Sequence, residues 1–123
     1  MQYKLYNDDF DIIIDSKGCE IISVVRKQDS KQYIWNGNPD AWKRHTPVLF
    51  PLVGRYKNDT SVYKGKEYHM TQHGFARDSE FTLVHKEDNV IIMSLTSSEA
   101  TKQKYPFDFE LMITHRLSGN NIS

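Results

Sequence analysis

The sequence predicts an all-β chain of about eight or nine short antiparallel strands, packed as a sandwich or a barrel. Two observations support this fold class. Segments in which apolar and polar residues alternate recur along the chain, and short turns rich in glycine or polar residues separate them. In addition, no segment of any length carries the stripe of apolar residues that marks an amphipathic helix.

Two strands are expected near the N-terminus, at residues 10–15 and 19–25. In the first, apolar residues at every second position share one face, as in a strand that buries one side. The second is apolar at most positions of both faces, so we expect it to be covered on both sides. The turn between them, residues 15–18, ends in Gly18, which supplies a positive φ where such a turn needs one.

The remaining strands follow the same pattern. A tight turn at residues 63–66 predicts a hairpin, and two strands are expected at residues 81–85 and 90–96 around a polar turn. The last strand, residues 107–117, alternates most regularly. Its apolar face is formed by Phe107, Phe109, Leu111, Ile113, His115 and Leu117.

Helical structure is expected only as single turns. Residues 97–104 suit one such turn, with Ser97 or Ser98 as the N-cap and Pro106 as a barrier to its continuation. A second short turn is expected at residues 39–44. Neither segment is long enough to alter the assignment of an all-β chain.

Length and composition exclude several functional classes. The 123 residues suit a single domain, and we expect no second domain within residues 1–123. Lys and Arg total 16 and so do Asp and Glu, a balance that argues against nucleic-acid binding. The single cysteine excludes an internal disulfide and a cysteine-rich zinc site. Without an apolar membrane span or a signal peptide in the sequence, we expect a cytoplasmic protein that does not contact the membrane.

One apolar segment, residues 46–55, differs from the strands. Pro47 and Pro51 interrupt it, and proline cannot donate to a β-ladder, so this segment cannot be a regular central strand. We expect it to be buried and rigid. It ends in Gly54 and Arg55, and a charge beside a buried segment must be paired or must bind something. Arg55 is therefore either a ligand contact or one half of a structural ion pair.

A second candidate segment is residues 71–77. Gly74 allows a sharp turn or the close approach of a ligand. His73 beside it is suited to acid–base work or to hydrogen bonding near neutral pH, and Arg77 is suited to holding hydroxyls or a phosphate. Each residue also has a purely structural interpretation, as a surface or core histidine and as an ion-paired arginine.

Other histidines do not form a recognisable site. His69 and His73 have the spacing of two zinc ligands on a helix, but the catalytic glutamate of that motif is missing and the surrounding pattern is that of a strand. We therefore expect no metal. His115, on the apolar face of the last strand, is expected to be a hydrogen-bonded core histidine.

Taken together, the segments at residues 46–58, 72–77 and 105–111 resemble the aldose 1-epimerase (galactose mutarotase-like) family, and most closely its LacX-type branch. The resemblance implies an antiparallel β-sandwich of which this chain is the N-terminal portion. It also implies mutarotation, the interconversion of the α and β anomers of an aldose such as galactose or glucose, or of a hexose phosphate. This reaction needs neither a cofactor nor a metal.

The resemblance assigns roles to individual residues. Arg55 corresponds to the arginine that contacts sugar hydroxyls, and His73 to the first catalytic histidine, which lies near the ring oxygen. Arg77 corresponds to a phosphate or substrate contact in relatives that act on hexose 6-phosphates. Phe75 and Asn58 belong to the same motifs and are expected to help bind the substrate.

The family also uses a second histidine as general acid and a glutamate as general base, both at positions later than residue 123. We therefore expect this chain to be a fragment that lacks the acid and the base. Two alternatives remain open: a carbohydrate-binding module without catalysis, and a structural remnant without sugar binding. A sandwich cut partway exposes strand edges, so self-association is expected.

Overall fold

The computed structural model describes residues 1–123, and β-strands form most of its regular structure. The strands are β1 (Gln2–Tyr6), β2 (Phe10–Asp15), β3 (Glu20–Arg26), β4 (Lys31–Gln32), β5 (Thr60–Tyr63), β6 (Lys66–His69), β7 (Thr82–Lys86), β8 (Val90–Thr96), β9 (Glu110–Ser118) and β10 (Asn121–Ile122). The helical elements are the single α-helical turn α1 (Glu99–Lys102) and the 3-10 turns η1 (Lys57–Asp59) and η2 (Ala76–Asp78). None of these helical elements is long and apolar enough to cross a membrane.

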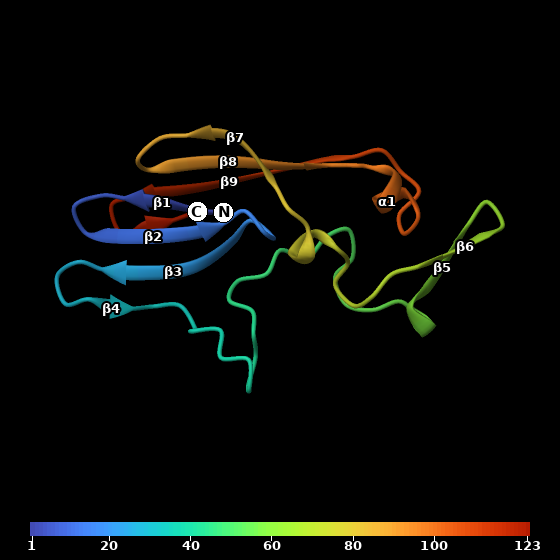
Figure 1. The fold of residues 1–123 in the computed structure, drawn as a ribbon, viewed down its shortest axis with the longest axis horizontal. Coiled ribbons are helices and arrows are strands. Elements are labelled where there is room, and N and C mark those ends of the chain that lie inside the picture. Colours follow the sequence, from blue (N-terminus) through green and yellow to red (C-terminus); the bar gives the residue numbers. More distant parts are fainter.

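Two four-stranded antiparallel sheets form the body of the chain (Figure 1). Their strand orders are β1-β2-β3-β4 and β10-β9-β8-β7. Backbone hydrogen bonds connect the sheets, for example from Tyr6 N to Asp88 O at 2.8 Å and from Phe81 N to Ser16 O at 2.9 Å. The predicted antiparallel β-sandwich is therefore confirmed.

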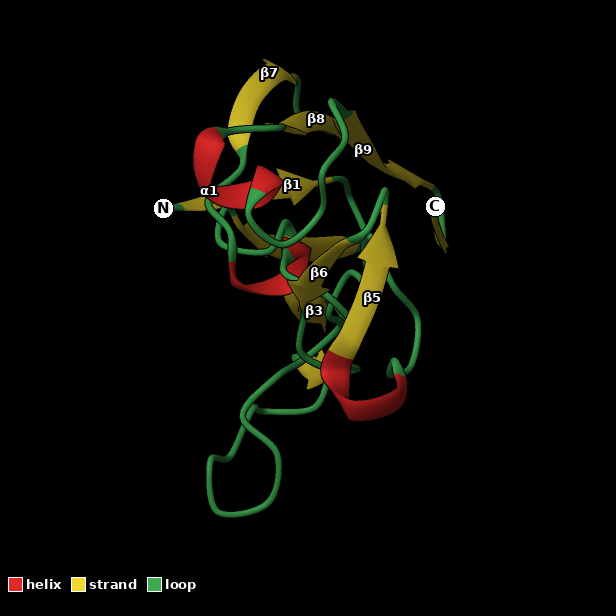
Figure 2. Cartoon of the chain, turned by 90° about the vertical axis from the view of Figure 1, so that its right-hand side faces the viewer, coloured by secondary structure: helices red, strands yellow, loops and turns green.

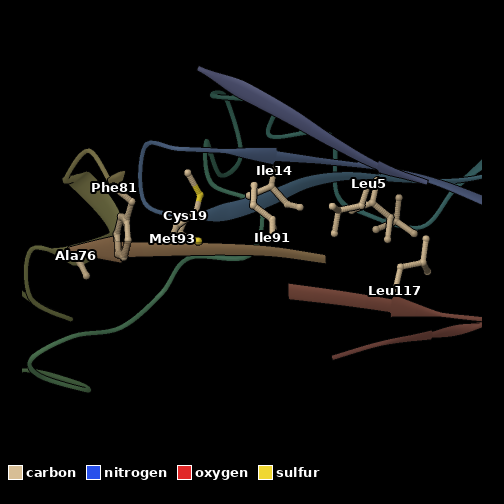
Figure 3. Close-up of a cluster of buried hydrophobic side chains, with 10 residues drawn as sticks. Leu5, Ile14, Cys19, Ala76, Phe81, Ile91, Met93 and Leu117 are labelled. Carbon is tan, nitrogen blue, oxygen red and sulfur yellow. The ribbon is translucent and has the colours of Figure 1, made fainter. Parts of the chain in front are cut away.

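The hydrophobic core lies between the two sheets (Figure 3). Leu5 and Ile14 of the first sheet face Ile91 and Leu117 of the second, and all four are essentially inaccessible to water. Each such side chain contributes about 1.5–3 kcal/mol through burial. The complete cluster is Leu5, Ile12, Ile14, Cys19, Val24, Ala76, Phe81, Ile91, Met93 and Leu117.

The strands near the N-terminus agree with the sequence in position but not fully in burial. β2 has the predicted bounds, and Gly18 has the expected positive φ of 76°. A Cβ at residue 18 would lie only 2.7 Å from the Arg77 carbonyl oxygen, so the close packing of this turn also requires glycine. The expected cover of β3 on both sides is found only in part. Val24 is buried, and the other six residues of the strand, on both faces, are half-buried.

The last strand begins later than the alternation predicts. β9 starts at Glu110, so Phe107 and Phe109 lie in the preceding loop. Their side chains join an aromatic cluster instead of a strand face: Phe109 contacts Phe50, and Phe107 contacts Tyr63, with ring centroids 5.0 and 4.8 Å apart. Tertiary packing of these rings thus replaces strand pairing at this end.

Short local elements match their predictions. The turn at residues 63–66 joins β5 to β6, and the resulting hairpin forms a separate two-stranded sheet. Figure 2 shows it in front of the sandwich. Helix α1 begins after Ser98, whose hydroxyl accepts a hydrogen bond from Thr101 N in a capping box. Residues 39–41 form a single hydrogen-bonded turn within the segment predicted at 39–44.

Candidate functional site

The proline-containing segment at residues 46–55 is irregular, as predicted, but it is not buried as predicted. Most of its residues are half-buried, and Val53 is 73% exposed. The segment is held by hydrogen bonds between Thr46 Oγ1 and the Ile21 backbone, and its Phe50 carbonyl oxygen accepts hydrogen bonds from Phe75 N and Ala76 N, each at 3.1 Å. The two candidate segments are therefore in direct backbone contact, and only Val53 and Arg55 of the first segment are exposed.

Gly74 lies where the two segments approach most closely. Its φ is +73°, and a Cβ at this position would lie 2.3 Å from the Phe50 carbonyl oxygen and 2.6 Å from its carbon. No real Cβ atom tolerates such distances to a backbone group. Gly74 was expected to allow either a sharp turn or the close approach of a ligand. The structure shows the sharp turn, and the group that approaches closely is the Phe50 backbone of the same chain.

Two reciprocal hydrogen bonds join His73 to Gly54. The His73 peptide N–H donates to the Gly54 carbonyl oxygen at 2.8 Å, and the Gly54 peptide N–H donates to Nδ1 of the His73 ring at 2.9 Å. His73 itself has a φ of 66°, in the left-handed region. Since Arg55 follows Gly54 directly, this pair of hydrogen bonds brings the two motifs of the sequence to one place.

Arg55 extends into solvent and is paired with Asp59. The Arg55 side chain is 63% exposed, and its Nε and Nη2 donate to the two Asp59 carboxylate oxygens at 2.6 and 3.2 Å. The hydrogen bond and charge of Asp59 raise the pKa of Arg55. The ion pair considered from sequence is thus present, and Asp59 is a site residue that sequence reasoning missed. The sequence feature that could have identified Asp59 is its spacing of four residues from Arg55. Asn58, next to Asp59, is exposed with a φ of 56°.

Arg77 is hydrogen-bonded to the backbone of its own loop. Its Nη2 donates to the Gln72 carbonyl oxygen at 2.8 Å, while its buried Nε has no hydrogen-bond partner. The guanidinium lines an open cavity of about 360 Å³. Neither Arg55 nor His73 lines this cavity, so the structure does not bring Arg77 into one pocket with them. Its charged lining is mixed: Lys17, Lys43, Arg44 and Arg77 are cationic, and Asp15, Glu20 and Asp78 are acidic.

Phe75 supports the site from beneath. It is only 8% exposed, and its ring contacts Phe50 edge-on with centroids 6.3 Å apart and Phe109 at 5.8 Å. Tyr105 completes this aromatic cluster through contacts with Phe50 and Phe109. The cluster anchors the loop that carries His73 to the sandwich.

The remaining histidines and the cysteine have structural surroundings. His115 is half-buried and donates from Nε2 to the Cys19 carbonyl oxygen at 3.0 Å, as expected of a core histidine. Burial lowers the pKa of His115 and raises that of the Cys19 thiol to about 12. His69 Nδ1 lies 3.1 Å from Thr60 Oγ1. No group of three or more His, Cys, Asp or Glu side chains is arranged to hold a metal ion.

Comparison with known proteins places this geometry in context. The family model described as aldose 1-epimerase matches residues 1–123. Plasmid and chromosomal LacX proteins of Lactococcus lactis are each 28% identical over 127 residues, which cover 99% of this chain and 42% of theirs. The chain therefore spans about two fifths of the length of these relatives.

Solved structures agree. The galactose mutarotase related enzyme of Lactobacillus acidophilus is 42% identical, with a TM-score of 0.96 over 98% of this chain and 40% of its own. A galactose mutarotase-like protein of Lactobacillus casei is 34% identical, with a TM-score of 0.95 over 99% of this chain and 42% of its own. The arrangement of the two sheets and the site loops is thus a conformation that longer natural proteins adopt.

Proposed function

The chain belongs to the aldose 1-epimerase family, and from this premise we propose that it binds an aldose where the segments at residues 46–58 and 72–77 meet. The observation that carries the proposal is the pair of hydrogen bonds between Gly54 and His73. These bonds hold Gly54, the neighbour of the exposed and charged Arg55, against the half-buried His73. We call Gly54, Arg55, His73 and Gly74 the His73 site.

The proposed contacts follow from the donors that remain free. The His73 ring hydrogen-bonds the sugar near its ring oxygen. Arg55 has five N–H donors, of which Asp59 occupies two, so three remain for sugar hydroxyls. A hydrogen bond to a charged group contributes about 1.5–3 kcal/mol. Asn58 borders this site, and Phe75 holds its loop in place.

Arg77 has a separate proposed role. Its guanidinium lies in a cavity with three other cationic side chains, and its Nε has no partner. The acidic Asp15, Glu20 and Asp78 line the same cavity, and Arg44 is paired with Asp78. We propose that Arg77, whose Nε remains unpaired, contributes to binding when the aldose carries a phosphate. Galactose and glucose require no such contact.

The proposed reaction is the exchange of α and β anomers. A base removes the proton of the C1 hydroxyl while an acid protonates the ring oxygen; the ring opens, the C1–C2 bond rotates, and the ring closes on the other face. Acid–base assistance of this kind contributes about 10²–10⁴-fold per group. We propose that an acid and a base other than His73 are needed, so that residues 1–123 alone bind sugar without accelerating the exchange.

An amide NMR titration with galactose tests the binding proposal. We expect saturable shifts confined to residues 54–58 and 72–77. myo-Inositol, a cyclic polyol without a ring oxygen, is the control ligand. His85→Ala, at an exposed histidine of β7, is the control variant for His73→Ala. Shifts that are absent, that spread over the sandwich, or that survive His73→Ala would contradict the proposal.

Polarimetry of freshly dissolved α-glucose separates binding from catalysis. We expect the chain to leave the rate of anomer exchange unchanged at concentrations that saturate the NMR shifts. Exchange that is accelerated and depends on His73 would show that residues 1–123 form a complete enzyme. Binding without acceleration supports a carbohydrate-binding role for this chain.

A further inference from the structure

The hydrogen bond from Gly54 to the His73 ring determines what that ring can offer a ligand. We infer that the Gly54 peptide N–H holds neutral His73 as the tautomer with its proton on Nε2, so that the ring presents a donor and no acceptor to the sugar. Gly54 is then a positioning residue that acts through His73. The sugar part of this inference rests on the proposed function, whereas the tautomer itself does not.

The inference follows from the direction of one hydrogen bond. A peptide N–H can only donate, and it lies 2.9 Å from Nδ1, so Nδ1 must be the accepting nitrogen. A neutral imidazole has one donor and one acceptor nitrogen, and the proton is therefore on Nε2. His115, another half-buried histidine, has the same tautomer for a different reason: its Nε2–H donates to the Cys19 carbonyl oxygen, so this donor is already occupied within the chain.

A backbone hydrogen bond also holds Gly54 and His73 next to each other. The His73 peptide N–H returns a hydrogen bond of 2.8 Å to the Gly54 carbonyl oxygen, so each residue both donates to and accepts from the other. The Phe50 carbonyl oxygen lies against Gly74 and bonds Phe75 N, which fixes the next two positions of the loop. Because Nδ1 faces Gly54, Nε2 points to the other side of the ring.

This arrangement restricts the role of His73 in sugar chemistry. An Nε2–H group can donate to the ring oxygen or to a hydroxyl oxygen, and it keeps its proton in doing so. It cannot take the proton from the C1 hydroxyl, because neither ring nitrogen then has a free lone pair. His73 is thus a donor that polarises the ring oxygen, and the general base of anomer exchange must be another group.

The tautomer can be read directly without sugar. In a long-range ¹H–¹⁵N spectrum of chain labelled with ¹⁵N-histidine, recorded at a pH where the imidazoles are neutral, the nitrogen coupled to both ring C–H protons is Nε2. We expect this nitrogen of His73 to appear at the protonated position and Nδ1 far downfield. The peaks of His73 are those that disappear in His73→Asn. The reverse pattern, or an average of the two tautomers, would overturn the inference.

Two variants with amide side chains at residue 73 test the roles of Nδ1 and Nε2 separately. Asn places its carbonyl oxygen near the position of Nδ1 and tolerates positive φ, so His73→Asn keeps an acceptor for Gly54 but has no donor at the Nε2 position. We expect its Gly54 amide shift to stay close to that of the parent chain and its galactose affinity to fall about tenfold. His73→Gln reaches the Nε2 position but cannot accept from Gly54, so its Gly54 amide shift should move.

Failure of this inference can be distinguished from failure of the proposed sugar binding. If the parent chain binds no galactose, the sugar proposal fails while the ¹⁵N spectrum still decides the tautomer. If the parent chain binds galactose and His73→Asn binds it within twofold, the Nε2 donor is unused and the sugar part of the inference is overturned. A carbasugar, in which CH₂ replaces the ring oxygen, should bind about tenfold more weakly than galactose to the parent chain and equally to His73→Asn.

Discussion

The carbonyl oxygen of Phe50 lies 2.3 Å from the place that a Cβ on residue 74 would occupy, and this contact sets the distance between the two segments of the site. Nothing larger than glycine fits there without moving backbone. Since His73 directly precedes Gly74 and Gly54 follows Phe50 closely in the first segment, the position of the histidine ring depends on this approach. The Phe50–Gly74 contact is thus a structural condition for the His73 site.

Gly74→Ala should therefore destabilise the chain by more than its φ alone explains. Positive φ costs a non-glycine residue about 1–2 kcal/mol, and forced displacement of packed atoms adds about 1–3 kcal/mol. Gly65→Ala is the matched control, because Gly65 has a φ of +78° but no atom within 4 Å of its Cβ position. Urea unfolding of both variants measures the difference. Equal losses of unfolding free energy in the two variants would show that the backbone at Phe50 moves aside at little cost.

Arg55→Ala should weaken galactose binding with little effect on stability. Its guanidinium is exposed and its ion pair with Asp59 is at the surface, where such pairs contribute little to the free energy of unfolding. The loss of a charged donor should lower the affinity about tenfold. Arg26→Ala is the control, since Arg26 is half-buried in β3 and likewise ion-paired, with Asp29. An equal effect of both variants on affinity would contradict a sugar contact at Arg55.

His115 should make the chain less stable as the pH falls. Burial lowers its pKa below the ordinary value of 6.5, so the unfolded state binds more protons between the two values. The stability that neutral His115 contributes is complete above pH 6.5 and is lost as the pH falls through the lower folded value. Urea unfolding from about pH 8 to about pH 5 measures this dependence. His115→Gln, which keeps a donor for Cys19, should flatten the profile; an unchanged profile would exclude His115 as its source.

The chain should self-associate through the free edge of strand β10. β10 pairs only with β9, so its other edge is free, and Ile122 on it is 38% exposed beside a cavity of about 810 Å³ between the sheet ends. Unpaired strand edges with apolar side chains favour pairing with another chain. Light scattering should give a mass above the monomer that rises with concentration. Ile122→Lys should lower it, whereas Met112→Lys, on the exposed face of β9, should not. A monomer at all concentrations would contradict this prediction.

The local elements of this fold were predictable from sequence. The alternation of residues 10–15 defines β2 with its exact bounds, the turn at 63–66 defines a hairpin, and Ser98 marks the start of α1. Strand faces, tight turns and helix caps depend on residues within a few positions of one another. The family resemblance came from the same short motifs, and it identified the antiparallel sandwich that the structure shows.

The connections between those elements were decided only by the tertiary structure. The sequence by itself singled out Arg55 and His73, but the bond from Gly54 to the His73 ring, the pairing of Arg55 with Asp59 and the exposure of Val53 appear only in the folded chain. Phe109 likewise continues the strand alternation yet leaves the strand to pack on Phe50. The physical reason is that periodicity is a property of neighbouring residues, whereas a hydrogen bond between segments far apart depends on how two sheets and their loops pack against each other.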